Sequence, residues 1–272
     1  MIDKGNPLPL PRISIVTPSY NQADFIEDTI LSVLEQSYPD LEYIVMDGGS
    51  TDGTLDVLRK YESRLTWISQ KDDGQAQAIN AGLAKASGDV LAFLNADDTY
   101  LPGALLAVGE YFAAHPEAGW LTGKCRIVDQ TGREFRRWIA AYKHFWLHTR
   151  SYAILQVLNY IAQPATFWRR EVFARIGGLD ESQQFTFDYD YWLRIGRHQR
   201  LHVLTGQLAA FRLYPSSKSG SRFEEQFVEE LQVCRRQAPP FMVWLHKLHT
   251  YGILGVYRWQ TAGRSKRPNR SN

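Results

Sequence analysis

The sequence has few cysteines and no marked excess of charge of either sign. Only Cys125 and Cys234 occur among 272 residues, and their spacing matches no metal-binding pattern. A disulfide framework is therefore not expected, and the chain suits a reducing compartment. The formal net charge of +2 is too small to indicate nucleic acid as a partner, so any basic surface must be local.

Long hydrophobic runs are also missing. No segment approaches the roughly 18 consecutive apolar residues that a membrane-spanning helix needs. The first twelve residues contain three prolines and no apolar core segment, so they do not read as a signal peptide. We therefore expect a cytoplasmic protein whose membrane contact, where it exists, is peripheral.

Two common glycine-rich phosphate-binding motifs are absent as well. The first predicted strand is not followed by G-x-G-x-x-G, and the chain has no G-x-x-x-x-G-K-[ST]. Dinucleotide-binding and P-loop proteins are therefore disfavoured. The remaining α/β interpretation is a nucleotide site built by Asp-rich loops and a metal ion.

Hydrophobic residues make up 44% of the chain and charged residues 22%, so a sizeable core can form. Short apolar segments alternate with helical patterns roughly every 25 to 30 residues, which is typical of βαβ units in a parallel sheet. The predicted strands are 13–17, 43–46, 65–69 and 90–94, followed later by 120–128.

Two helices carry recognisable start signals. Ile26, Ile30 and Val33 recur at helical spacing, and Asn21 is the predicted N-cap of that helix. Pro102 is expected to open a second helix that ends near residue 115. The residues 129–132 predict a turn that leads into a further short strand.

Asp97 and Asp98 follow directly after the strand predicted at 90–94. Ligands of open α/β sheets bind at the carboxyl ends of the strands. Two adjacent acids repel each other unless a cation neutralises them, and oxygen-only ligation suits Mg²⁺ or Mn²⁺. The alternative is an Asp-rich turn that leads into the next helix.

The loops after the other strands are polar too, and they are expected at the same edge of the sheet. Asp47 with Gly48 is either part of a site or a simple turn. Gln75 ends the loop after the third strand. Asn80 is either a site residue or an ordinary polar residue on a helix surface, although its immediate neighbours are apolar.

Four motifs, in order, resemble family 2 glycosyltransferases: residues 13–21, 45–54, 88–98 and 177–180. The resemblance covers Arg12 to Ser219. It implies an inverting enzyme of the GT-A fold, a Rossmann-like α/β fold with a mostly parallel central sheet flanked by helices. It also implies a nucleotide-sugar donor and a divalent cation.

The resemblance assigns roles to individual residues. The resemblance places Thr17, Pro18 and Tyr20 at the base and ribose pocket, and Asp47 and Gly48 at the nucleobase contact. From the polar loops themselves, Gln75, Asn80 and Asn95 are also predicted to bind the donor. The resemblance also places the metal ion and the diphosphate-ribose end of the donor beside Asp97 and Asp98. Asn95 stands where many members have Asp, so metal ligation is expected from Asp97 and Asp98 alone.

Asp188 matches the general base of the family, and the chemistry requires such a carboxylate to take the proton of the acceptor hydroxyl. Its alternative role is that of a helix N-cap. Arg212 and Lys218 match diphosphate contacts, or else form a solvated basic loop. A histidine common in the family is replaced by Tyr214, so no third metal ligand is assumed there.

Two aromatic stretches lie outside the family core. Residues 136–160 would stack on acceptor sugars, lie on a bilayer, or pack on the core as helices. The stretch from Pro239 suits an interfacial helix with a polybasic end drawn to anionic lipid, or a helix that packs on its own domain. It combines Phe241, Trp244, Leu245, Leu248, Leu254, Tyr257 and Trp259 with Lys247, Arg258, Arg264, Lys266, Arg267 and Arg270.

We therefore expect a GT-A domain over residues 1–222 with a helical appendage at 223–272. Its nucleotide-binding half would span about 12–100 and its acceptor half about 101–222. The expected reaction is metal-dependent, inverting sugar transfer from a nucleotide-diphosphate donor, first of all a UDP-sugar, to a glycan or lipid-linked acceptor. Its setting would be cell-envelope polysaccharide assembly at the inner face of the cytoplasmic membrane.

Two alternatives remain. A catalytically silent nucleotide- or glycan-binding subunit would have no need of the base Asp188. A sugar-phosphate nucleotidyltransferase would carry a glycine-rich, basic signature after the first strand, where this chain has Pro18-Ser19-Tyr20-Asn21.

Overall fold

The computed structural model describes residues 8–265, with side chains up to residue 255. A single eight-stranded sheet has the order β3-β2-β1-β4-β7-β6-β8-β5. Its strands are β1 (Ile13–Ser19), β2 (Leu41–Asp47), β3 (Thr66–Ser69), β4 (Val90–Phe93), β5 (Thr99–Tyr100), β6 (Trp120–Val128), β7 (Thr166–Arg169) and β8 (His202–Arg212).

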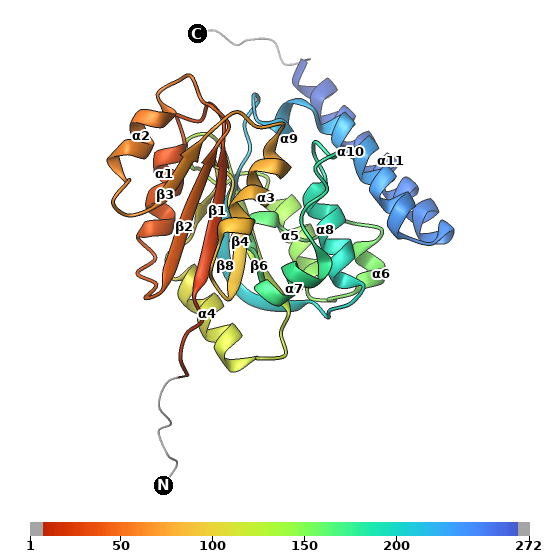
Figure 1. The fold of residues 1–272 in the computed structure, drawn as a ribbon. Coiled ribbons are helices and arrows are strands. Elements are labelled where there is room, and N and C mark those ends of the chain that lie inside the picture. The colour runs from red at the N-terminus through yellow and green to blue at the C-terminus, as the bar shows by residue number, and fades with distance from the viewer. Residues whose placement is uncertain (1–7, 266–272) are drawn as a thin grey trace.

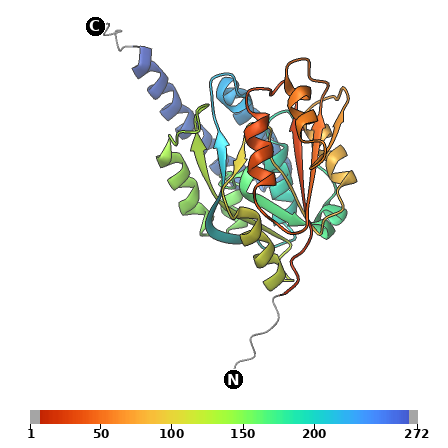
Figure 2. The same cartoon turned by 90° about the vertical axis from the view of Figure 1, so that its left-hand side faces the viewer.

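Helices cover both faces of this sheet (Figures 1 and 2). They are α1 (Ile26–Leu34), α2 (Thr54–Lys60), α3 (Gln75–Lys85), α4 (Ala104–Ala114), α5 (Arg137–Leu147), α6 (Tyr152–Leu155), α7 (Arg170–Ile176), α8 (Phe187–Gly196), α9 (Lys218–Ser221), α10 (Phe223–Gln237) and α11 (Pro240–Ser265), with a 3-10 turn at Gln163–Ala165.

The first four strands in the order, β3, β2, β1 and β4, run parallel, as the sequence predicts. The second half is mixed: β7 is antiparallel to both β4 and β6, while β6 and β8 are parallel. The expected fold class, a mostly parallel α/β sheet flanked by helices with C-terminal helices added, is confirmed.

Strand residues alternate between two hydrophobic cores, because successive side chains of a strand point to opposite faces. Ile13 and Ile15 of β1 belong to the core beneath α1, α2 and α4. Val16 belongs to the opposite core, which α3 and α8 cover. Both faces of β1 are buried, which explains its continuous apolar character.

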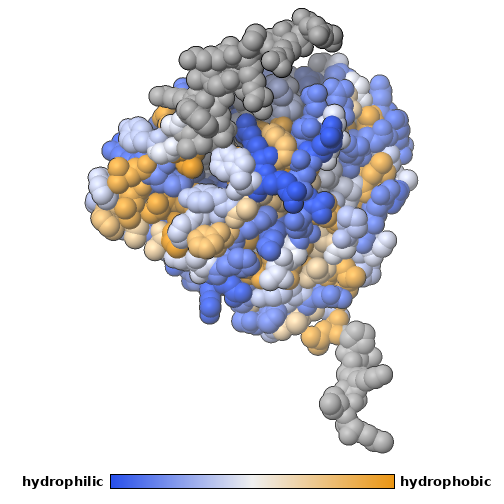
Figure 3. Space-filling view, turned by 180° about the vertical axis from the view of Figure 1, so that it is seen from behind, coloured by the Kyte–Doolittle hydropathy of each residue, from blue (hydrophilic) through white to orange (hydrophobic). Residues whose placement is uncertain are grey.

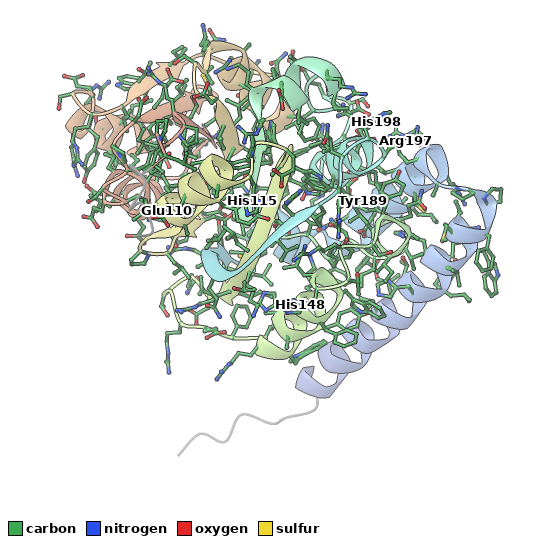
Figure 4. The ribbon with its side chains drawn as sticks, turned by 90° about the horizontal axis from the view of Figure 1, so that it is seen from below. Glu110, His115, His148, Tyr189, Arg197 and His198 are labelled. Atoms are coloured by element: carbon green, nitrogen blue, oxygen red, sulfur yellow. The ribbon has the colours of Figure 1, made fainter. Side chains whose placement is uncertain are left out.

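The helices after residue 222 pack against the rest of the chain. Glu229 of α10 accepts hydrogen bonds from the main-chain N–H groups of Gln184 and Phe185, just before α8. Tyr189 of α8, which is labelled in Figure 4, stacks on His246 of α11 with ring centroids 6.2 Å apart. The stretch 136–160 contains the helices α5 and α6, in agreement with one of the predictions made from its sequence. Helix α5 contacts β6.

Two local predictions are corrected. Asn21 does not cap α1, which begins at Ile26 after Phe25 with no side-chain cap. Asn21 has a positive φ of 51°, and its amide oxygen accepts a hydrogen bond from the N–H of Thr51, so it joins the loops after β1 and β2. The short strand expected after the 129–132 turn is reduced to an isolated bridge between Val128 and Glu134.

Close packing of α3 on the sheet depends on Gly82. A Cβ added there would lie 2.4 Å from Cγ1 of Val16, so either the helix or the strand would have to move. We predict that Gly82→Ala lowers the free energy of unfolding by about 1–3 kcal/mol, as measured by urea denaturation. Gly252→Ala in α11 is the matched control, because no atom lies within 4 Å of its added Cβ. Equal stability of the two variants would contradict this explanation.

Candidate functional site

A cleft with a cavity volume of about 640 Å³ opens at the carboxyl ends of β1 and β4. It continues past the start of α8 towards α5, α10 and α11. Many of the residues predicted for the site line it, namely Pro18, Tyr20, Gln75, Asn95, Asp97, Asp188, Arg212 and Lys218. The other predicted residues lie outside its lining: Thr17, Asp47, Gly48, Asn80 and Asp98.

A chain of hydrogen bonds crosses the cleft. The ammonium group of Lys218 donates to Oε1 of Gln75 over 3.3 Å, and Nε2 of Gln75 donates to Oδ1 of Asn95 over 2.7 Å. Asn95 in turn donates to Oδ2 of Asp98 over 3.2 Å. The chain joins the start of α9 to the end of β4, and it places the ammonium of Lys218 at the cleft.

The two adjacent aspartates differ in orientation. Asp97 faces the cleft, where the hydroxyl of Tyr214 donates to its Oδ2 over 3.1 Å. Asp98 is fully buried, and its Oδ1 accepts the N–H of Arg212 over 2.8 Å. Burial raises the pKa of both carboxyl groups, and the charge of Asp97 raises that of Asp98 further. A cation beside Asp97 would relieve this repulsion.

The guanidinium of Arg212 is engaged within the protein. It donates to the main-chain oxygens of Asp97 and Gln130 and to Oδ2 of Asp28, over 2.9–3.0 Å, and it stands over the ring of Phe25. These bonds fasten the end of β8 to the Asp97 loop. Of the two predicted cations, Lys218 is therefore the better placed for a diphosphate. Arg212 also lines the cleft, and its contact with the diphosphate stays a prediction.

Asp47 lies at the end of β2 with its carboxylate turned into its own loop. Its oxygens accept hydrogen bonds from the N–H groups of Gly49 and Ser50 and from the hydroxyls of Ser50 and Ser69. With 2% of its surface exposed, the predicted nucleobase contact has a loop-forming position. This geometry agrees with the alternative prediction, in which Asp47 and Gly48 form a turn.

Asp72 lines the cleft beside Gly48 and was not singled out in the sequence. A Cβ at position 48 would come within 2.7 Å of its carboxylate, so the glycine allows this approach. Burial and the charges of Asp47 and Asp73 raise the pKa of Asp72. The sequence feature that could have identified Asp72 is its position in the polar loop after the third strand.

Asn80 and Thr17 are bonded inside the fold. The amide of Asn80 donates to the oxygen of Leu179 and to Glu181, and its Oδ1 accepts the N–H of Leu179. Asn80 thus holds the Gly177–Asp180 loop against α3. The hydroxyl of Thr17 is buried and shares a hydrogen bond of 3.0 Å with that of Tyr43.

Asp188 lies in the first turn of α8 and lines the same cleft as Asp97. The cap position of this helix is Thr186, so the alternative role of Asp188 as N-cap is excluded. Burial raises the pKa of Asp188 to about 6, opposed by the N–H of Tyr189 and the charge of Lys143. A carboxylate with this pKa is ionised at neutral pH and can accept a proton there.

Comparison with known proteins identifies the family. Residues 14–177, more than half of the chain, match the family described as "Glycosyl transferase family 2". The chain belongs to glycosyl transferase family 2. The matched range includes the Asp97–Asp98 pair and ends before Asp188. The location of Asp188 in the cleft is therefore known from the structure and not from the family match.

Relatives of this family 2 chain include TuaG of Bacillus subtilis, named for a glycosyltransferase of teichuronic acid biosynthesis. The two are 44% identical over 136 residues, which cover 48% of this chain and 53% of TuaG. The O-antigen biosynthesis protein RfbC of Myxococcus xanthus is 33% identical over 193 residues, covering 68% of this chain and 14% of RfbC. The chain thus spans about half the length of TuaG and a smaller part of RfbC.

Solved structures show the same fold. The mannosyltransferase PcManGT from Pyrobaculum calidifontis, in complex with GDP-Man and Mn²⁺, has a TM-score of 0.67 at 21% identity, covering 90% of this chain and 71% of PcManGT. Residues 1–349 of S. aureus TarS in complex with UDP have a TM-score of 0.61 at 19% identity, covering 83% and 65%. The family 2 domain therefore has a GT-A-like fold.

The raised pKa of Asp188 leads to a stability prediction. Because its pKa is higher folded than unfolded, the folded state binds more protons, and the wild type loses stability as the pH rises from about 4 to 6. Asp188→Asn should therefore raise the melting temperature at pH 8 and leave it nearly unchanged at pH 4. The exposed Asp56 of α2 provides the control Asp56→Asn. The same shift at both pH values would refute this linkage.

Proposed function

We propose that this chain is an inverting, metal-dependent glycosyltransferase that uses a nucleotide-diphosphate-sugar donor. The observation that carries the proposal is a single cleft lined by both Asp97 and Asp188. The names of the relatives agree with it, since TuaG is named as a glycosyltransferase and TarS was solved with UDP. Uracil is the first base to test.

Tyr20, Asp72 and Gln75 line the part of the cleft proposed for the nucleotide. The ammonium of Lys218, held by Gln75, would meet the diphosphate. Burial lowers the pKa of Lys218, so pairing with an anion would favour its charged form. The diphosphate would then lie between Lys218 and Asp97.

The residues present fit a divalent cation shared with the donor. The described residues contain no group of three or more His, Cys, Asp or Glu side chains able to hold a metal. Mg²⁺ or Mn²⁺ would therefore take the Asp97 carboxylate, donor phosphate oxygens and water. Asp98 was also predicted to bind the metal, but both of its oxygens already accept hydrogen bonds. We therefore propose that Asp98 does not bind the cation directly and instead influences Asp97 through its charge. When bound, the cation would stabilise the charge on the leaving diphosphate.

Asp188 would remove the proton of an acceptor hydroxyl. The hydroxyl oxygen would form a bond to the anomeric carbon of the donor, while the bond from that carbon to the diphosphate breaks with its electron pair. This single displacement inverts the anomeric configuration. Because the pKa of Asp188 is about 6, the rate should fall with decreasing pH below that value.

A thermal-shift assay separates donor binding from transfer. UDP, GDP and dTDP, each with and without Mn²⁺, should raise the melting temperature only when the matching base and the metal are present together. Asp97→Asn should abolish the Mn²⁺-dependent shift. Asp188→Asn should retain it and lose at least 100-fold in the rate of sugar transfer or donor hydrolysis. Equal loss of the thermal shift in both variants would contradict this division of roles.

We further propose that α11 contacts the membrane surface at the inner face of the cytoplasmic membrane. One side of the helix buries His246 and Thr250, while the other exposes Phe241, Trp244, Leu248 and Tyr251, each by more than half. Figure 3 shows hydrophobic side chains gathered at the left edge, on the side where α11 lies. An exposed aromatic face of this kind suits an interfacial helix.

The polybasic end predicted to accompany this face lies outside the described side chains, from Arg258 to Arg270. Within the described residues, no helix is long and apolar enough to cross a membrane. The form of membrane association that we propose is peripheral contact, on the evidence of the exposed aromatic face.

Vesicle sedimentation tests this contact. The full chain should bind vesicles of phosphatidylcholine with phosphatidylglycerol, and Phe241→Ser with Trp244→Ser should reduce the bound fraction at least fivefold. Leu106→Ser on α4 is the control, because Leu106 is also an exposed hydrophobic residue, on a different helix. Unchanged binding of the double variant would exclude the α11 face as the contact.

A further inference from the structure

The cleft extends beyond Asp188 into a second region, which we call the inner branch. Tyr142 and Lys143 of α5, Phe227 and Glu230 of α10, and His249 of α11 line it. These residues come from α5, α10 and α11, helices that follow the Asp97 loop in the chain (Figure 1). A molecule held in the inner branch would therefore share the cleft with Asp188 and the proposed donor.

Two charged side chains, Lys143 and Glu230, line the same cleft as Asp188. Burial raises the pKa of Glu230 to about 7 and lowers that of Lys143, and the charge of each opposes the shift of the other. Lys143 acts on Asp188 in the same way. Within the described residues, however, no hydrogen bond or ion pair joins Lys143 directly to either carboxylate. Each therefore retains polar atoms for a ligand.

Aromatic surface adjoins these charges. The hydroxyl of Tyr142 shares a hydrogen bond of 3.2 Å with Nε2 of His249, and the two rings are nearly parallel, at 8°. Phe227 lies about one helical turn before Glu230 on α10. An aromatic wall with a few fixed polar groups is a common form of small-molecule site. It combines contact area with directional hydrogen bonds.

This combination fits a sugar ring better than an alkyl chain. A pyranose presents C–H groups to an aromatic face and hydroxyls to charged side chains, and hydrogen bonds to charged groups are stronger than those between neutral groups. An alkyl chain in the same space would remove water from Lys143 and Glu230 without replacing its hydrogen bonds, which is costly. The charges thus select against a purely apolar ligand.

We propose that the inner branch is the acceptor subsite and that it binds a sugar residue of a glycan, with Lys143 donating to its hydroxyls and Glu230 accepting from them. This inference rests on the proposed glycosyltransferase activity. It places the recognised hydroxyls next to the one that Asp188 deprotonates. It also assigns acceptor selection to α5 and α10, and α10 lies beyond the segment that matches the family.

Release of nucleoside diphosphate tests this subsite. The full chain is mixed with Mn²⁺ and UDP-glucose, UDP-N-acetylglucosamine, UDP-galactose or GDP-mannose, first without acceptor to measure donor hydrolysis. Methyl glycosides of glucose, galactose, mannose and N-acetylglucosamine are then added at millimolar concentrations. At least one methyl glycoside should accelerate release, whereas 1-octanol should not.

Glu230→Gln and Lys143→Met should each raise the methyl glycoside concentration for half-maximal acceleration at least tenfold. In Glu230→Gln, donor hydrolysis without acceptor should stay within about threefold of wild type at pH 8, where Asp188 is ionised. The matched controls are Glu110→Gln on α4 and Lys85→Met on α3, both exposed. Figure 4 shows Glu110 on the opposite side of the molecule from α11.

Several results would overturn the subsite. One is Asp188-dependent donor hydrolysis that no methyl glycoside accelerates, and another is acceleration by octanol alone. If the variants lost donor hydrolysis and acceptor-dependent acceleration equally, Lys143 and Glu230 would act on the base Asp188 and would not bind the acceptor. In all three cases the proposed function stands. No turnover of any donor under any condition would overturn the proposed function and this inference together.

Discussion

Burial of Asp98 is the constraint on which the rest of the site depends. Its carboxylate accepts a main-chain N–H from the end of β8 and an amide N–H from Asn95, and its main-chain oxygen accepts the hydroxyl of Thr29. These contacts join β4, β8 and α1. A buried carboxylate is stable only when it is hydrogen-bonded in this way. With Asp98 held inside, its neighbour Asp97 faces the cleft.

The site separates its carboxylates by environment. Asp97 and Asp98 lie side by side, and their mutual repulsion favours a cation. Asp188 lies on another helix, with Lys143 as the favourable charge near it. In the proposed reaction the first environment would serve the leaving diphosphate and the second the attacking hydroxyl. Similar side chains thereby acquire different chemistry.

Local patterns predicted the sheet well, because a buried parallel strand needs only a short apolar run and a polar loop after it. The strands 13–17, 43–46 and 90–94 are present with small differences at their ends. The cap of α1 was predicted wrongly, since Asn21 bonds to Thr51, which lies 30 residues away. Local sequence offers no sign of such a partner.

The sequence alone determined the four parallel strands β1 to β4 with the helices between them, the family, and the acidic pair after β4. Tertiary structure decided which polar groups reach the cleft. Asp47 and Asn80 both follow the expected pattern, yet each uses its polar atoms within the protein. Lys143 and Glu230 carry no motif and nevertheless line the cleft. The physical reason is that a polar side chain turns toward its strongest available partners, and the fold brings those partners from distant parts of the chain, as with Asp98 and Arg212, 114 residues apart.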